Sequence, residues 1–176
     1  MTTSEATSQE PGSDENLVAI YLDDHRAGAA AGAALARRIE DRYGDEPGFE
    51  ALVQLRQEID DDVRTLDALR DRLDVHGGCV KRVVALVGER LGRLKLNGHL
   101  LRPSPLSKVL ELEMLSAGVT AKERLWDGLM AVCDTEQLAD VDLHAQRERA
   151  TDQLERLREL HLRAAAAIGC PSPDRA

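Results

Sequence analysis

The feature that most constrains this chain is a set of four stretches in which mostly apolar residues recur at spacings of three and four. Residues at these spacings share one face of an α-helix, so each stretch predicts a helix with one buried face. Each face is interrupted near its middle by one charge, and these charges are Asp24, Asp62, Lys122 and Arg147. A charge on a buried face is costly unless it is paired. Two acids and two bases therefore predict an ion layer inside a four-helix bundle.

The residues of the four faces can be read directly from the chain. The first face is Leu17, Tyr21, Asp24, Gly28, Ala31 and Leu35. The second is Leu52, Leu55, Ile59, Asp62, Leu66, Leu69 and Leu73. The third is Leu112, Leu115, Val119, Lys122, Trp126, Leu129 and Cys133. The fourth is Leu143, Arg147, Ala150, Leu154, Leu157, His161, Ala164 and Ile168.

Composition and turn residues favour an all-α domain. The chain has only one Trp, two Tyr and one Phe, whereas the strands of a sheet are enriched in aromatic and β-branched residues. Ser13, Gly44, Pro105 and Gly169 suit helix ends. We expect one domain over residues 13–169, with disordered tails at 1–12 and 170–176. The expected helices cover about residues 14–43, 45–76, 80–97, 105–133 and 135–168.

The expected connections are short between the first two long helices and between the last two, which makes two antiparallel hairpins. The shorter helix over 80–97 spans roughly 27 Å at ~1.5 Å per residue, enough for a crossover along the bundle. Two hairpins joined by one long crossover resemble the ferritin-like superfamily over about residues 14–168. The resemblance implies a ferritin-like four-helix bundle with a shorter fifth helix in the crossover.

Ferritin-like oxidases hold iron or manganese at mid-bundle with Glu residues and Glu-x-x-His motifs. A chain with such a site would have a Glu three positions before some of its histidines. The residues three positions before the five histidines of this chain are Leu22, Leu73, Leu96, Val141 and Arg158, so no such motif exists. We therefore expect a degenerate, metal-free member without a cofactor, in which the four-residue ion layer takes the place of the metal ions. Its expected role is structural or in protein interaction, and non-catalytic, with a protein partner or a homodimer.

Two other interpretations of the charged residues stay open at this stage. Lys and Arg side chains can extend to the rim of a bundle, which would take the charges out of the core. Alternatively, the chain is a divergent iron- or manganese-binding protein with carboxylate and imidazole ligands at mid-bundle. The candidate ligands for that alternative are Asp24, His25, Asp62, Glu123, His144 and Glu148.

The net charge of −9 is unevenly distributed. Residues 79–108 hold seven bases and one acid, while the segments on either side are acidic. An acidic protein is a poor general binder of nucleic acid. The basic segment offers a candidate partner-binding surface, made by Lys81, Arg82, Arg90, Arg93 and Lys95. Residues 79–102 could lie on an anionic membrane surface, or could pack their valines on the bundle while their bases offset its acids.

Cysteine spacing and the first residues bear on the compartment. Cys79, Cys133 and Cys170 are far apart and odd in number, which favours free thiols in a reducing compartment. The chain begins with polar and acidic residues, unlike a secretory signal peptide. The longest weakly apolar run, 27–36, is too short to span a bilayer. We therefore expect a cytoplasmic protein without a transmembrane segment.

Overall fold

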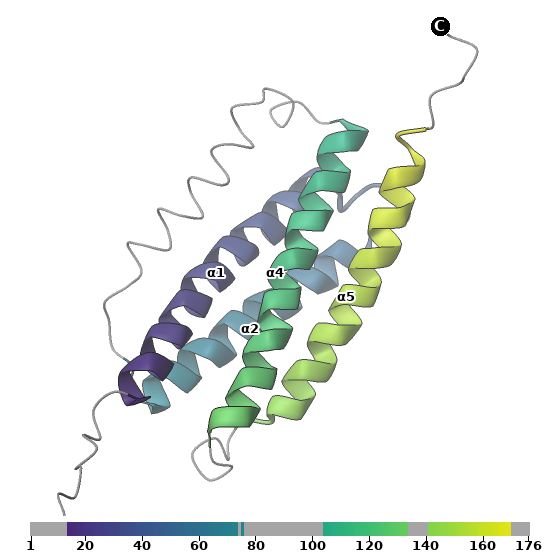
Figure 1. Ribbon diagram of the computed structural model, residues 1–176. Coiled ribbons are helices and arrows are strands. Elements are labelled where there is room, and N and C mark those ends of the chain that lie inside the picture. Colours follow the sequence, from purple (N-terminus) through teal and green to yellow (C-terminus); the bar gives the residue numbers. More distant parts are fainter. Residues whose placement is uncertain (1–13, 74, 76–103, 134–140, 170–176) are drawn as a thin grey trace, which may run out of the picture.

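The computed structural model describes residues 14–73, 75, 104–133 and 141–169, and within these ranges every regular element is an α-helix (Figure 1). The helices are α1 (Asp14–Tyr43), α2 (Ala51–Arg72), α4 (Pro105–Val132) and α5 (Leu143–Ala166). The expected all-α bundle is therefore confirmed. None of these helices combines the length and the apolarity needed to cross a membrane.

The four helices form two antiparallel pairs, α1 with α2 and α4 with α5 (Figure 1). α4 runs in the same direction as α2, and α5 in the same direction as α1. α1 also packs against α4, whereas α2 and α5 touch only lightly. The expected helix over 80–97 and the two expected disordered tails lie outside the described residues.

The turn between α1 and α2 is longer than expected. Gly44 closes α1 as predicted, and its amide donates to the carbonyl of Glu40 at 2.7 Å. A side chain at Gly44 would collide with that carbonyl, since a Cβ there would lie 2.7 Å from the oxygen. α2 begins at Ala51 rather than near residue 45, because Gly48 has a φ of +86°, a left-handed conformation that a right-handed helix cannot include.

In the α4–α5 pair, the predicted start of α4 is correct and that of α5 is not. Ser104 caps α4 as predicted: its hydroxyl accepts a hydrogen bond from the amide of Ser107 at 3.1 Å, and Pro105 is the first helical residue. α5 begins at Leu143 rather than at 135, because Asp142 is extended and its carboxylate accepts from the amide of Ala145 at 2.9 Å.

The predicted buried faces are correct for α2 and α4, largely correct for α5 and displaced for α1. α2 buries Leu52, Leu55, Ile59, Asp62, Leu66 and Leu69, and α4 buries Leu112, Leu115, Val119, Trp126 and Leu129, all as predicted. α1 instead buries Leu22, Asp23, Ala27, Ala33, Leu35, Ala36, Ile39 and Tyr43. α5 buries Leu143, Ala150, Leu157 and Ala164 as predicted, and also Gln153 and Leu160, while the predicted Arg147 and Ile168 are exposed.

Candidate functional site at mid-bundle

Asp62 and Lys122 meet inside the bundle, near the middle of α2 and of α4. The Lys122 ammonium donates a hydrogen bond to Asp62 Oδ2, and the side chains are 15% and 5% exposed. Burial lowers the pKa of Lys122 below its ordinary 10.5, and the charge of Asp62 opposes that shift. The pair holds α2 against α4, which lie diagonally across the bundle.

Gln153 of α5 completes this contact, although sequence reasoning missed it. Its side chain is fully buried, and its amide oxygen accepts a second hydrogen bond from the Lys122 ammonium. Its amide nitrogen donates to Asp62 Oδ2 at 3.1 Å and to Glu58 Oε2 at 3.2 Å. One amide therefore bridges two carboxylates and one ammonium and joins α5 to α2 and α4.

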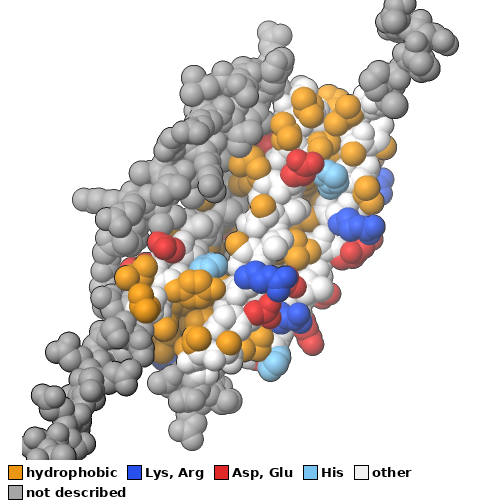
Figure 2. Space-filling view, viewed as in Figure 1, with side chains coloured by type: hydrophobic (Ala, Val, Ile, Leu, Met, Phe, Trp, Pro, Cys, Tyr) orange, Lys and Arg blue, Asp and Glu red, His pale blue; other side chains and the backbone are white. Residues whose placement is uncertain are grey.

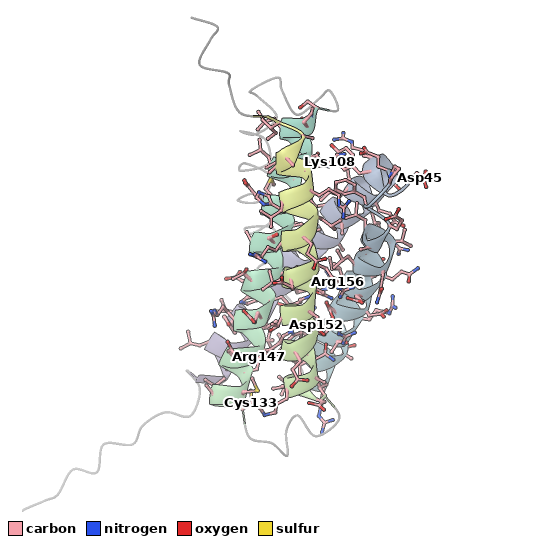
Figure 3. The ribbon with its side chains drawn as sticks, turned by 90° about the vertical axis from the view of Figure 1, so that its right-hand side faces the viewer. Asp45, Lys108, Cys133, Arg147, Asp152 and Arg156 are labelled. Carbon is pink, nitrogen blue, oxygen red and sulfur yellow. The ribbon has the colours of Figure 1, made fainter. Side chains whose placement is uncertain are left out.

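Two arginines of α5 supply the remaining countercharges. Arg149 Nε lies 3.3 Å from Asp62 Oδ1, and Arg156 Nη1 donates to Glu58 Oε1 at 3.0 Å. Burial favours a higher pKa for Glu58, but hydrogen bonds from Arg156 and Gln153 outweigh it and hold that pKa below 4.5. Figure 3 shows Arg156 on the side of α5 that faces α2. The ion cluster is defined as Glu58, Asp62, Lys122, Arg149, Gln153 and Arg156.

A cavity of about 110 Å³ lies beside the cluster, between α1, α2 and α4. Its walls are mainly apolar, and Asp62 and Lys122 are its charged lining residues within the described part of the chain. Trp126, one helical turn beyond Lys122 on α4, also lines it. The Trp126 indole N–H is buried and has no hydrogen-bond acceptor among the described residues.

Small residues form the edge of this mid-bundle cavity. Gly28 of α1 and Gly118 of α4 both line it and are both exposed, so the cavity reaches the surface between these two helices. A Cβ at either position would meet no atom within 4 Å. The glycines are thus not required for close helix packing, although each costs about 1 kcal/mol relative to alanine in a helix. His25 also lines the edge, and burial lowers its pKa, opposed by Asp24.

The four-residue ion layer predicted from the sequence is wrong for two of its members. Asp24 is exposed, because α1 is rotated so that the preceding residue faces inward. That residue, Asp23, is 5% exposed and accepts a hydrogen bond from Arg70 Nε at 3.1 Å. Arg147 is exposed and pairs with Asp127 at 2.7 Å on the side of α5 nearest α4 (Figure 3).

The six candidate metal ligands do not converge in the structure. Asp62 is bound by the cations of the ion cluster, while Asp24, His144 and Glu148 are exposed. Glu123 accepts a hydrogen bond from the Thr151 hydroxyl at 2.9 Å. Among the described residues, no three His, Cys, Asp or Glu side chains come close enough to share a metal ion. The candidate partner-binding residues Lys81, Arg82, Arg90, Arg93 and Lys95 lie outside the described residues.

Searches among protein-family models, curated proteins and solved structures found no match to this chain.

Proposed function

We propose that the protein is a metal-free, ferritin-like four-helix bundle with a non-catalytic role in structure or protein interaction. The directions of the helices support the ferritin-like part of this proposal, because α4 runs parallel to α2 after a long connection (Figure 1). The observation that carries the metal-free part is the Lys122 ammonium, which is bound to Asp62 and Gln153 within the core.

A lysine at this position acts against a metal centre in two ways. Its positive charge repels a divalent ion in a region where water screens poorly. It also neutralises Asp62, together with Arg149, so that no ion is needed to compensate the buried carboxylate. The function proposed for the cluster is thus to join α2, α4 and α5 at mid-bundle by paired charges.

The iron- or manganese-binding alternative is tested by elemental analysis. We expect purified protein, saturated with iron or manganese and then desalted, to retain far less than one ion per chain. Asp62→Asn should not change that content. Near-stoichiometric metal that is lost in Asp62→Asn would refute the proposal, and Glu155→Gln, which changes an exposed acid on α5, is the matched control.

An interaction role has support at the end of the bundle where α1 begins and α4 ends. Leu17, Ile20 and Val132 are 63%, 41% and 65% exposed, and Figure 2 shows hydrophobic side chains on this part of the surface. Gly128 lies against Tyr21, so the antiparallel α1 and α4 bring Leu17 and Val132 to the same end. Light scattering of the purified protein and of Leu17→Ser/Val132→Ser tests self-association: a wild-type dimer that the variant lacks would support it, and a monomer in both would exclude it.

A further inference from the structure

The cations of the ion cluster differ in their exposure to water. Lys122 and Arg149 both contact the one carboxylate of Asp62, and Arg156 pairs with Glu58. The side chains of Arg149 and Arg156 are 31% and 25% exposed and lie beside the acids Glu148, Asp152 and Glu155, whereas Lys122 is 15% exposed and lines the cavity. A carboxylate beside Lys122 would accept a charge-assisted hydrogen bond, which is stronger than a bond between neutral groups. On the cavity side of the cluster, the available cation is the Lys122 ammonium.

Two hydrogen-bond donors at the cavity lack an acceptor among the described residues. An ammonium has three donors, and within the described structure Lys122 uses two of them, on Asp62 and Gln153. Trp126 is 1% exposed, and its indole N–H, which can only donate, has no acceptor among the described residues. Lys122 and Trp126 are four residues apart and therefore neighbours on one face of α4. A buried donor without a partner costs about 1–3 kcal/mol.

The remaining walls fit a hydrocarbon group. Leu66, Leu115 and Leu125 are among the apolar residues around the cavity of about 110 Å³. An apolar cavity of about 150 Å³ can hold a molecule of the size of benzene, so about four to six carbon atoms fit here. Gly28 and Gly118 leave the edge open to the surface between α1 and α4.

We propose that the mid-bundle cavity binds a small monocarboxylate with a short, branched hydrocarbon tail. Its carboxylate accepts hydrogen bonds from Lys122 Nζ and the Trp126 indole, and its tail packs against the leucines. The negative charge of Asp62 does not repel it strongly, since Lys122, Arg149 and Gln153 already bind that carboxylate. The Lys122 ammonium would repel a divalent cation, and a neutral apolar molecule would leave the Lys122 and Trp126 donors without an acceptor.

The sole tryptophan of the chain gives a direct assay. We would titrate chelator-treated full-length protein with 3-methylbutanoate, recording Trp126 emission and heat of binding, and with 3-methylbutanamide, which has the same shape without the charge. We expect saturable binding of the acid and at least tenfold weaker binding of the amide. Equal affinity for acid and amide, or no binding of the acid at millimolar concentration, would overturn the proposal.

Variants locate the binding. Lys122→Met should weaken the acid at least tenfold, while Arg147→Met, which removes an exposed cation outside the cavity, should not. Gly118→Leu should abolish binding with the helical circular dichroism retained, because its side chain fills space that is now open. Should Lys122→Met not fold, Gly118→Leu alone decides, and binding that survives it would place the ligand elsewhere and refute the site.

This inference rests on the proposed function in one respect, the absence of a metal ion beside Asp62. The titration uses chelator-treated protein and an organic acid, whereas the proposed function is tested by metal content. A failure of one can therefore be told from a failure of the other.

Discussion

Lys122→Met removes the positive charge from the core while keeping most of the apolar volume of the side chain. Breaking a buried ion pair by removing one partner typically costs 3–5 kcal/mol, because the other charge stays buried. Here Asp62 retains Arg149 at 3.3 Å and the amide of Gln153 at 3.1 Å. We therefore expect the lower end of that range, about 3 kcal/mol.

Urea unfolding measures this loss. With a slope of about 2 kcal/mol per molar urea, the midpoint should fall by about 1.5 M. Trp126 fluorescence and circular dichroism should give the same transition if unfolding is two-state. Arg147→Met is the matched control, because this exposed arginine pairs with Asp127 at the surface, where ion pairs contribute about 0–1 kcal/mol.

The double variant separates the charge pair from side-chain packing. Lys122→Met with Asp62→Leu removes both charges, so part of the lost stability should return. A loss below about 0.5 kcal/mol for Lys122→Met alone would refute the reasoning, since surface substitutions have effects of that size. A double variant as unstable as the sum of the two single variants would show that the charges are not coupled.

Three further outcomes follow from the structure and can be measured by the same unfolding assay. Gly118→Ala should stabilise the protein by up to about 1 kcal/mol, as expected for a helical glycine, because its new Cβ meets open space. Gly128→Ala should stabilise it less, since its Cβ would lie 3.0 Å from the Tyr21 hydroxyl. Gly48→Ala should destabilise the protein by about 1–2 kcal/mol, because φ is +86° there; no measurable loss would contradict the described turn. Glu58 has a lowered pKa in the folded protein, so its contribution to folding stability is present above pH 4.5 and is lost as the pH falls through the folded pKa. Glu58→Gln should therefore flatten the fall in stability below pH 4.5. An unchanged slope would contradict the Arg156 contact.

The sequence predicted the buried faces of α2 and α4 because polar and apolar residues contrast strongly there. In α2, Leu55, Ile59 and Leu66 stand among charged and polar neighbours, so the phase of the helix is unambiguous. The same clarity in α4 placed Lys122 on the inner face. These two helices are also the ones whose interrupting charges, Asp62 and Lys122, meet in the structure.

The sequence did not determine which face of α1 is buried, and it determined that of α5 only in part. In α1, the run of alanine and glycine over 27–36 has little polar contrast, so the sequence favoured Asp24 over the buried Asp23. In α5, adjacent residues compete for the inner face. The spacing predicts Leu154 on the inner face, where it is partly buried, and the structure buries the adjacent Gln153 fully, with its amide bonded to Lys122 and Asp62.

The turns show which local signals were sufficient. Ser104 followed by Pro105 marks a helix start through both a cap and a fixed φ, and that start was predicted correctly. Pro47-Gly48 is ambiguous, because the pair suits a turn and a Pro also suits the first turn of a helix; the structure has the turn. Asp142 is a good N-cap residue, but the earlier capping-box spacing at residues 134 and 137 was the stronger pattern in sequence.

The central claim is that paired side-chain charges, and not a bound metal, neutralise the middle of the bundle. A crystal structure of the protein soaked in manganese, with an anomalous difference map, tests it most directly. We predict the Lys122 ammonium within hydrogen-bond distance of Asp62 and no anomalous peak beside that carboxylate. A manganese ion bound to Asp62, with Lys122 turned away to solvent, would contradict the claim.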